Sequence, residues 1–513
     1  MRADAVVSVD CSTSASKAIV WDRSGQPLSE GRAAFPLLNP HPTWWEQRAG
    51  DWWEATASAL RQAMSTVDPS RVAALCMSHQ RETFVPVDEG GRPLRNGILW
   101  LDERAGRELD DINALVGATK YHQISGKPLS TTPSLPKILW LQKHEPDLFQ
   151  RAHKYLDVHA YLVFKMTGRY KTSWGCADPM GLFDMANGKW AGDLMSAFGL
   201  RVEQFPEVYP PGAVMDRVSA EAAVACGLPA GLPIVAALGD GQSAGLGANI
   251  TSPGQAYLNL GTAVVSGAFS EEYSADPAFR TLTGGVPGTY LLETVLRGGT
   301  FTVSWFLEKF GTAGSGELGP DLSPEEVCEA AAREVPPGSL GLMLVPYWNG
   351  VMNPYWDPAA SGIVAGWRGS HGKPHLYRAI LEGIAFEQRL ATSGVEAAIG
   401  LPIERFIAMG GGSRSPLWCQ IVADITGKPV TRSASPEATC LGAAVLAATA
   451  AGLHSDVRQA ASAMVRLGDT FTPDGDAQAI YDRLYSEVYR DLFPSLQGAL
   501  GRLDTLTHGA DGR

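Results

Sequence analysis

The 513-residue sequence predicts an α/β protein made of two lobes with a cleft between them. A chain of this length exceeds the size that one hydrophobic core normally supports, so two or three domains are expected. Apolar strand patterns open the chain at residues 5–9 and 17–22. A similar strand–turn–strand pattern appears again at 255–260 and 263–269, which indicates a second α/β unit.

The pattern that restarts after residue 246 sets the expected boundary. We expect a first lobe over residues 1–247, a second lobe over 248–513 and a hinge around 245–255. Ser323-Pro324-Glu325-Glu326 is typical of a helix start, with a serine cap, a proline in the first turn and a capping-box glutamate. The other expected elements are a helix over 52–67 capped by Asp51, strands at 27–33, 72–78, 83–88, 233–238, 291–297 and 340–346, a loop and helix over 132–144, helices over 152–168, 373–393, 415–426 and 439–453, and a loop at 311–321.

Composition narrows the classes of function. The net charge of −12 and the lack of a basic cluster argue against binding to nucleic acid or to an anionic membrane. Seven scattered cysteines without CxxC spacing favour reduced thiols and a cytoplasmic protein. The N-terminal apolar run is too short for a signal peptide, and the longest apolar stretch, 439–453, is shorter than a membrane span. We therefore expect no membrane partner.

Two turns of small residues are candidate phosphate sites. The first follows Asp10 and contains Ser12, Thr13 and Ser14, with Lys17 shortly beyond. Hydroxyls and bare backbone N–H groups suit phosphate oxygens, and a carboxylate at a strand end can serve Mg²⁺ through water. An ordinary Asx turn in a hairpin is the alternative for this segment alone. The phosphate interpretation is favoured because Gly261 and Thr262 form a similar turn in the second half.

Asp240 is the candidate general base. It lies between two glycines after the apolar strand 233–238, where a ligand can approach closely. Its carboxylate could accept the proton of a hydroxyl that attacks a γ-phosphate. The alternative is a helix N-cap for the segment that begins near Gln242, and the two roles are compatible.

The same segment also matches a hydrolase motif. Gly241-Gln242-Ser243-Ala244-Gly245 fits G-x-S-x-G after a strand, with Ser243 as nucleophile. Asp357, His371 and His375 could then complete a triad. The hydrolase interpretation leaves both phosphate-type turns unexplained, and short glycine motifs often match by accident.

Gly410-Gly411-Gly412-Ser413 follows an apolar strand and precedes a helix. Such a turn lets a flat ring or a phosphate lie against bare backbone near a helix N-terminus, although glycine turns before helices are also common for structural reasons. We assign Gly411, Gly412 and Ser413 to the adenosine end of a nucleotide site.

Two dense polar segments are candidates for binding a small polyhydroxylated substrate. Gln80, Arg81 and Glu82 lie between two apolar strands, and Trp100 and Asp102 follow further along. Arginine can donate to vicinal hydroxyls and glutamate can accept from them, while tryptophan covers the carbon skeleton. A surface ion pair beside a core tryptophan is the alternative.

Together these segments resemble the FGGY family of carbohydrate kinases, within the actin-like superfamily of sugar kinases and chaperone ATPases. The likeness covers nearly the whole chain. Residues 132–141 (TPSLPKILWL) resemble the first family signature, and 362–366 (GIVAG) with 375–382 (HLYRAILE) resemble the second.

The resemblance implies two actin-like (ribonuclease H-like) lobes that bind ATP and Mg²⁺ in the cleft, with a sugar or polyol deeper within it. It places Asp240 as catalytic base and Asp10 with Asp240 at the metal. Many relatives are dimers, so a homodimer is also implied. The implied phosphate contacts are Ser12, Thr13, Ser14, Lys17, Gly261 and Thr262, the implied adenine contacts are Gly411, Gly412 and Ser413, and the implied substrate contacts are Gln80, Arg81, Glu82, Trp100, Asp102, Asp240 and Gln242.

The substrate stays open at this level. Gln80-Arg81-Glu82-Thr83 resembles glycerol kinases and also kinases of a quorum-sensing dihydroxy-dione. Residues 354–357 and 410–418 resemble xylulokinases, so a pentulose is the favoured substrate. Two further classes are a protein-binding ATPase of the actin or chaperone type and the serine hydrolase that would use Ser243.

Overall fold

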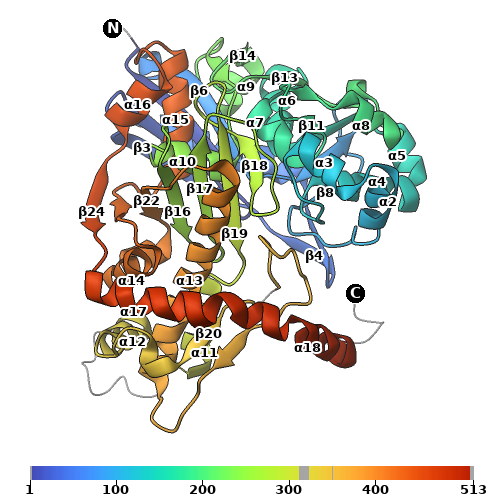
Figure 1. The fold of residues 1–513 in the computed structure, drawn as a ribbon. Coiled ribbons are helices and arrows are strands. Elements are labelled where there is room, and N and C mark those ends of the chain that lie inside the picture. Colours follow the sequence, from blue (N-terminus) through green and yellow to red (C-terminus); the bar gives the residue numbers. More distant parts are fainter. Residues whose placement is uncertain (1–2, 311–322, 349, 509–513) are drawn as a thin grey trace.

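The computed structural model describes residues 3–310, 323–348 and 350–508, and the loop predicted at 311–321 lies outside them. Two large mixed sheets dominate the fold (Figure 1). We call the six-stranded sheet with its helices the first lobe and the seven-stranded sheet with its helices the second lobe. The strand orders are β14-β15-β6-β1-β2-β3 and β18-β19-β17-β16-β22-β23-β24.

The first sheet brings three strand ends to one edge. β1 runs parallel to β6, and β6 runs parallel to β15, so that Asp10 pairs with Ser78 and His79 is bridged to Gly239. Residues that follow parallel strands therefore meet at this edge. The strands are β1 (Ala5–Cys11), β2 (Ala15–Asp22), β3 (Pro27–Ala34), β6 (Val72–His79), β14 (Val214–Arg217) and β15 (Pro233–Val235).

The second sheet repeats this arrangement. β16 is antiparallel to β17 and parallel to β22, as β1 is antiparallel to β2 and parallel to β6. The predicted restart of the strand pattern is confirmed. The strands are β16 (Gln255–Leu260), β17 (Val264–Ser270), β18 (Arg280–Thr283), β19 (Tyr290–Leu296), β22 (Arg405–Met409), β23 (Val430–Ser433) and β24 (Leu467–Phe471).

Two helices cross between the sheets with their backbones in contact. They are α10 (Asp240–Gly247) and α15 (Ala438–Ala450), and α15 confirms the buried apolar helix predicted over 439–453 but ends at Ala450. A Cβ added to Gly247 would lie 1.9 Å from the carbonyl oxygen of Ala438, and one added to Gly442 would lie 1.8 Å from that of Ser243. Glycine at both positions is therefore required for this close approach.

The first lobe carries an extension of short helices, drawn in cyan to green in Figure 1, and a five-stranded sheet. Two residues that the sequence assigns to the substrate, Trp100 and Asp102, directly follow one strand of this extension. Its sheet contains β4 (Leu38–His41), β5 (Trp44–Gln47), β8 (Gly97–Ile98), β7 (Phe84–Val87) and β9 (Lys154–Asp157), and two small pairs join β10 (Lys171–Ser173) to β13 (Glu207–Tyr209) and β11 (Phe183–Asp184) to β12 (Lys189–Trp190). The helices of the first lobe are α1 (Ala49–Met64), α2 (Glu108–Leu115), α3 (Ala118–Ser125), α4 (Ser134–His144), α5 (Pro146–Arg151), α6 (Val158–Thr167), α7 (Trp174–Ala177), α8 (Gly192–Ala197) and α9 (Ala220–Cys226).

The remaining elements surround the second sheet. The capping box at Ser323 is confirmed, since its hydroxyl accepts from the Glu326 N–H and Glu326 accepts from the Ser323 N–H. These elements are α11 (Thr300–Phe310), α12 (Pro324–Arg333), β20 (Met343–Val345), β21 (Ile363–Ala365), α13 (Lys373–Ile399), α14 (Pro416–Thr426), α16 (Val457–Met464), α17 (Gly475–Leu484) and α18 (Arg490–His508).

Two local predictions were wrong. Asp51 does not cap α1, because the chain is already helical from Ala49 and Arg48 occupies the N-cap position. Asp51 lies in the first turn, where the helix dipole favours an acid without any capping bond. The predicted helix over 152–168 begins instead as β9, which pairs with β7. Asp157 then caps α6 by accepting from the Ala160 N–H at 2.9 Å.

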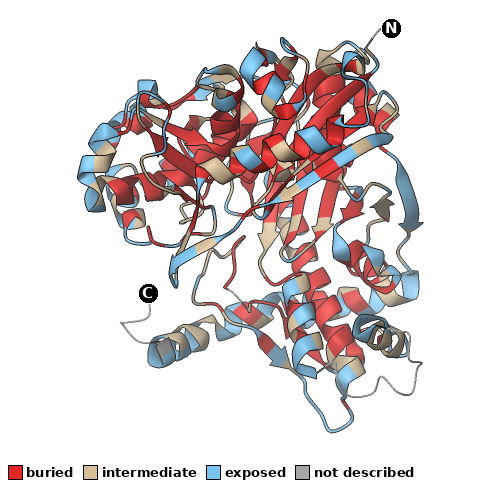
Figure 2. Cartoon of the chain, turned by 180° about the vertical axis from the view of Figure 1, so that it is seen from behind, coloured by how far each residue is buried: buried red, intermediate tan, exposed pale blue. Residues whose placement is uncertain are grey.

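Buried residues fill the central strands of both large sheets and the helices between them, whereas outer strands such as β3 and β24 are largely exposed, as Figure 2 shows. One buried apolar cluster contains residues of both sheets and of α15. The lobes therefore share a core beneath the cleft. Among the described residues, no helix combines the length and hydropathy needed to cross a membrane.

Candidate active site

Asp240 lies where the ends of β1, β6 and β15 meet. It is the first residue of α10, and Gly239 occupies the N-cap position without a side-chain cap. Its Oδ1 accepts from the Gly241 N–H at 2.7 Å and forms an ion pair with Arg81, whose Nε lies 2.8 Å away. The Asp240 side chain remains 40% exposed, so a held carboxylate still faces the cleft.

The glycines on both sides of Asp240 make room for its arginine partner. A Cβ at Gly239 would lie 2.4 Å from Arg81 Cγ. One at Gly241 would lie 2.9 Å from Arg81 Nη2 and 2.7 Å from Glu293 Oε2. The Gly-Asp-Gly pattern that marked Asp240 in the sequence therefore results from the close packing of a buried guanidinium group against this turn.

A row of residues from the second lobe faces Arg81. Tyr257, Gly267, Glu293 and Arg280 are neighbours in register across β16, β17, β19 and β18. Arg81 Nη1 donates to both oxygens of Glu293 at 3.0 and 3.1 Å. Arg280 Nε donates to Glu293 Oε1 at 2.6 Å, and the Tyr257 hydroxyl donates to Oε2 at 2.9 Å. The Glu293 carboxylate is thus saturated by three partners.

This charge network fixes protonation states. Burial alone would raise the pKa of the Glu293 carboxyl, but Arg280 and Arg81 outweigh burial and lower that pKa to about 2. Burial also opposes the charge of Arg81, yet Glu293 and Asp240 raise the pKa of Arg81 well above its usual value. Glu293 and Arg81 are therefore a permanent ion pair at neutral pH.

Glu82 joins the same network from the first lobe. Its carboxylate accepts from Arg280 Nη1 at 2.9 Å, and its carbonyl accepts from the Ser134 hydroxyl at 2.7 Å. Its backbone has a φ of 59°, which is unfavourable for a glutamate and is retained here by these contacts. The predicted pair Arg81 and Glu82 thus lies at the junction of the lobes, each residue held by the second lobe.

Asp10 is the opposite case. Its Oδ1 is buried and has no hydrogen-bond partner among the described residues. Burial, followed by the charges of Asp240 and Glu437, raises the pKa of Asp10 to about 7. Lys17, its register partner on β2, has its ammonium group 2.7 Å from Glu437 and 3.1 Å from Glu30. The carboxylate of Asp10 therefore lacks a neutralising partner of its own.

A closed ring of hydrogen bonds joins the first predicted phosphate turn to the predicted substrate segments. Gln47 Nε2 donates to the Thr13 carbonyl, and Gln80 Nε2 donates to Gln47 Oε1 at 2.8 Å. Thr83 Oγ1 donates to Gln80 Oε1 at 3.3 Å and accepts from the Trp100 N–H at 3.2 Å. Trp100 Nε1 then donates to Thr13 Oγ1 at 3.0 Å, which completes the ring.

Two predicted substrate residues have internal partners. The Asp102 carboxylate is buried and accepts from Arg104 and from the Trp45 N–H. Gln242 Nε2 donates to the Gly175 carbonyl at 3.0 Å and to Asp178 at 3.2 Å. The Gln242 Oε1 atom is buried and has no hydrogen-bond partner among the described residues.

The turns of the second lobe lie at neighbouring strand ends. Gly261 and Thr262 join β16 to β17, and their carbonyls accept from the first N–H groups of α11. Gly410, with a φ of 82°, follows β22, which pairs with β16. A Cβ at Gly411 would meet no atom within 4 Å, whereas one at Gly412 would meet Trp418. Ser413 closes the turn by donating to the Gly410 carbonyl at 2.8 Å.

The hydrolase alternative is wrong. Gly241 to Gly245 lie within α10 and not at a strand-to-helix elbow. Ser243 is fully buried and its hydroxyl donates to the Thr439 carbonyl at 2.9 Å. His371 contacts the Arg368 N–H and the Leu340 carbonyl, while Asp357 accepts from Gln497. The motif match reflects the small residues that α10 needs against α15.

Sequence reasoning missed the residues of the second-lobe row. Glu293, Arg280 and Tyr257 belong to strands without a recognisable motif, and they gather only through strand register. Gln47 was also missed, since it ends a short strand far from the first turn. A charged glutamate and arginine inside apolar strands were the only available signal.

Comparison with known proteins agrees with this architecture. The profile of the FGGY family of carbohydrate kinases, N-terminal domain, matches residues 5–247, and that of the C-terminal domain matches 256–451. The chain belongs to the FGGY family of carbohydrate kinases. The FGGY assignment decides between a carbohydrate kinase and the protein-binding ATPase in favour of the kinase. The enzyme is therefore an ATP-dependent phosphotransferase with a sugar or polyol as acceptor.

Individual FGGY relatives have two different named acceptors. Xylulose kinase from Escherichia coli (strain K12) is 28% identical over 494 residues, 95% of this chain and 99% of the relative. Glycerol kinase from Alkalilimnicola ehrlichii is 31% identical over 465 residues, 88% of this chain and 91% of the relative. The crystal structure of xylulose kinase from Rhodospirillum rubrum has a TM-score of 0.89 at 29% identity and covers 97% of this chain and 99% of that one.

Proposed function

We propose that this FGGY kinase phosphorylates an uncharged open-chain sugar or polyol, with a pentulose such as xylulose as the best candidate. The main observation behind the proposal is that the guanidinium groups of Arg81 and Arg280 both form ion pairs with carboxylates of the protein. Arg81 is bound by Asp240 and Glu293, and Arg280 is bound by Glu82 and Glu293. A carboxylate or phosphate on the acceptor that bound either guanidinium group would have to displace one of these buried pairs, which is costly.

The pentulose is favoured over glycerol and the dihydroxy-dione by two kinds of similarity. The relatives named xylulose kinase match along nearly the whole chain, as does the R. rubrum structure. The segments at 354–357 and 410–418 also resemble xylulokinases. The Arg81–Glu82 pair keeps glycerol as the main alternative, since it resembles glycerol kinases.

Asp240 acts as general base in this proposal. The substrate hydroxyl oxygen attacks the γ-phosphorus of ATP, and the hydroxyl proton moves to the Asp240 carboxylate. The bond between the γ-phosphorus and the β,γ-bridging oxygen of ATP breaks, and ADP leaves. Arg81 holds Asp240 Oδ1 at 2.8 Å, so the base is oriented before the substrate arrives. Arg81, Glu82, Trp100, Gln80 and Gln242 would line the acceptor side.

The residues present fit Mg²⁺ as part of an ATP complex. The unpartnered, buried Oδ1 of Asp10 and the nearby charge of Asp240 make a region that favours a cation. Among the described residues, no cluster of three or more His, Cys, Asp or Glu side chains could hold a metal ion. Magnesium commonly keeps its waters and takes one or two carboxylates plus phosphate oxygens, which suits Asp10 and Asp240. When bound, it would neutralise phosphate charge during transfer.

We further propose that the enzyme is cytoplasmic, which its seven free cysteines support. We also propose that the lobes comprise residues 1–247 and 248–513, and that the nucleotide contacts both. The first-lobe turn would hold terminal phosphates, and the open backbone at Gly411 leaves space for the adenosine. The assigned phosphate contacts are Ser12, Thr13, Ser14, Lys17, Gly261 and Thr262, and the assigned adenosine contacts are Gly411, Gly412 and Ser413.

The test is ADP production from ATP and Mg²⁺ with matched acceptors. D-xylulose and D-xylonate have the same carbon number and differ in the carboxylate, so they isolate the charge argument. We expect the highest kcat/KM with a pentulose and none above background with xylonate. Glycerol and the dihydroxy-dione complete the panel, and a preference for either would change the named substrate. Preference for the aldonate would refute the uncharged acceptor.

A further inference from the structure

We propose that Glu293 is a positioning residue for phosphoryl transfer: it is contributed by the second lobe, anchors Arg81, and through Arg81 orients Asp240. This inference rests on the proposed role of Asp240 as general base. Glu293 does not touch the reacting atoms in this scheme. It determines where the guanidinium group that holds the base can lie.

The sheet register explains how Glu293 reaches the catalytic turn. Tyr257 and Glu293 are both neighbours of Gly267 on β17, one on each side. A Cβ at Gly267 would lie 2.4 Å from the Tyr257 ring, so only glycine lets the tyrosine cross this position. The Tyr257 hydroxyl then reaches Glu293, and Arg280 reaches it from the next strand. The row leaves Glu293 a single orientation, toward Arg81.

Burial and saturation exclude Glu293 as a substrate ligand. Its residue is 1% exposed, and both carboxylate oxygens accept from Arg81, with Arg280 and Tyr257 as further donors. A hydroxyl of the acceptor could bind only by removing one of these donors. The carboxylate is therefore part of the frame around the site.

The charge balance gives this frame a chemical purpose. During transfer Asp240 takes up a proton and stops being a counterion for Arg81. A buried arginine that lost its only carboxylate would carry an uncompensated charge. Glu293 stays ionised throughout, because its two arginines keep its pKa at about 2. Arg81 therefore remains neutralised and in place while the charge on Asp240 changes.

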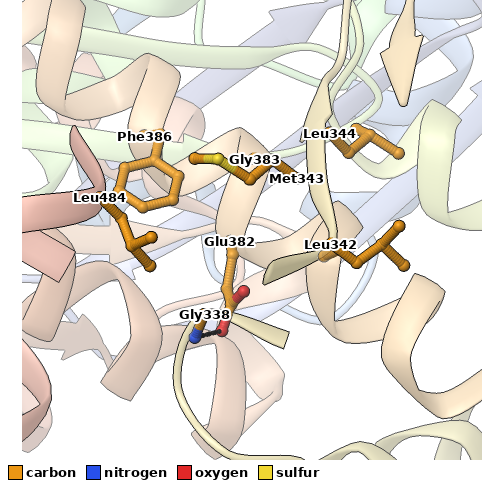
Figure 3. Close-up of a pocket in the computed structure, with 9 residues that line it drawn as sticks. Gly338, Leu342, Met343, Leu344, Glu382, Gly383, Phe386 and Leu484 are labelled. Carbon is orange, nitrogen blue, oxygen red and sulfur yellow. Dashed lines mark hydrogen bonds between the residues drawn. The ribbon is translucent and has the colours of Figure 1, made fainter. Parts of the chain in front are cut away.

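The chain contains a matched control. Glu382 on α13 is also buried and accepts from an arginine, Arg378 Nε at 2.8 Å, and from a tyrosine, the Tyr481 hydroxyl at 2.7 Å. Figure 3 shows Glu382 bonded to the Gly338 backbone N–H, beside Phe386 and Leu484. No residue assigned to the substrate or nucleotide contacts it. Glu382 therefore reports the cost of neutralising a buried glutamate outside the site.

The experiment compares Glu293→Gln with Glu382→Gln in the full-length enzyme, using its best acceptor. We expect Glu293→Gln to lower kcat by roughly 10- to 100-fold with the KM for ATP unchanged, since supporting residues typically act on this scale. Glu382→Gln should leave kcat within twofold of the parent. Similar kcat losses in both variants, or an unchanged kcat in Glu293→Gln, would overturn the inference.

A double-mutant cycle tests the route through Arg81. Arg81→Lys removes the guanidinium group that contacts both Asp240 and Glu293. In that background, adding Glu293→Gln should lower kcat by less than about threefold, because the effects of interacting residues are not additive. A full second loss in that background would show that Glu293 acts independently of Arg81. Should Glu293→Gln fail to fold, Tyr257→Phe against Tyr481→Phe repeats the comparison, and only the former should lower kcat.

Asp240→Asn separates failure of this inference from failure of the proposed function. If Asp240→Asn keeps wild-type kcat, the base assignment fails and the positioning role fails with it. If Asp240→Asn is inactive while Glu293→Gln is fully active, the base assignment stands and only the positioning role is lost.

Discussion

The strand ends of the first lobe and the facing row of the second lobe treat buried carboxylates in opposite ways. On the first side, Asp10 has a buried oxygen without a partner, and its pKa is raised to about 7. On the second side, Glu293 is buried but has three donors, and its pKa is lowered to about 2. Burial raises the pKa of both acids, so the partners decide the difference.

In the proposed function, this contrast corresponds to two different tasks within one cleft. An acid that must receive a metal ion or its waters keeps an unsatisfied oxygen and costs stability until the ligand arrives. An acid that must hold other side chains is fully satisfied and gains rigidity. Asp240 lies between the two regions, with one oxygen held by Arg81 and a side chain that is partly exposed.

The largest expected effect is the loss of kcat on substitution of Asp240, which lies between the two regions. Asp240→Asn keeps the shape of the side chain but removes the acceptor for the hydroxyl proton, so kcat should fall by roughly 1000-fold. Coupled ADP release measures kcat, and calorimetry should show ATP binding within a few-fold of the parent. Turnover near the parent value would exclude Asp240 from proton transfer.

A smaller loss is expected where the two regions touch. Gly241→Ala places a Cβ 2.7 Å from Glu293 Oε2 and 2.9 Å from Arg81 Nη2, so the carboxylate and the guanidinium group must separate. We expect kcat/KM to fall by roughly 10- to 100-fold, as for other supporting contacts. Gly475→Ala is the control, since its added Cβ meets nothing within 4 Å. Parent-like activity in Gly241→Ala would show that the contact tolerates displacement.

The pH dependence of unfolding tests how much the ionised Glu293 contributes to stability. The folded-state pKa of Glu293 lies below that of an unfolded glutamate, so its ionisation stabilises the protein above about pH 4.5 and ceases to do so as pH falls toward 2. Glu293→Gln should lower the melting temperature by roughly 3 °C at pH 7. The gap from the parent should narrow between pH 4.5 and 3. A gap independent of pH would indicate a packing effect.

The smallest expected effect is on the stability contributed by Asp10 in the first lobe. The folded-state pKa of Asp10 lies above that of an unfolded aspartate, so the folded state binds the extra proton and stability falls as pH rises from about 4 to 7. Without ligands, Asp10→Asn should therefore raise the melting temperature by roughly 2 °C at pH 8, with less gain at pH 5. Differential scanning fluorimetry in EDTA measures this change.

Adding Mg²⁺ and ATP should reverse the order of stability in the same assay. The parent would gain more than Asp10→Asn, because the ligand binds the folded state that has the carboxylate. Equal gains in both proteins would mean that Asp10 does not contribute to binding the metal–nucleotide complex.

Much of the first region could be predicted from the sequence, because its signals are local. Asp10 and Asp240 each follow an apolar strand and stand beside small residues, and parallel strands bring such ends together. The capping box at Ser323 was also readable, since its donors and acceptors lie within four residues.

The second region could not be predicted, because strand register creates it. Nothing near Glu293 in the chain indicates that Arg280 will be its cross-strand neighbour or that Gly267 will clear the way for Tyr257. The start of the helix predicted over 152–168 was wrong for a related reason. Tyr155 lies in β9, not in the predicted helix, because that segment pairs with β7, a contact distant along the chain.

The closed ring through Thr13, Gln47, Gln80, Thr83 and Trp100 limits how this enzyme can be redesigned. Libraries that seek a new acceptor would naturally vary the polar segment after β6. Each change at Gln80 or Thr83, however, also loosens the turn assigned to ATP. Acceptor preference and nucleotide affinity should therefore evolve together at these positions, and a variant selected for one will need to be screened for the other.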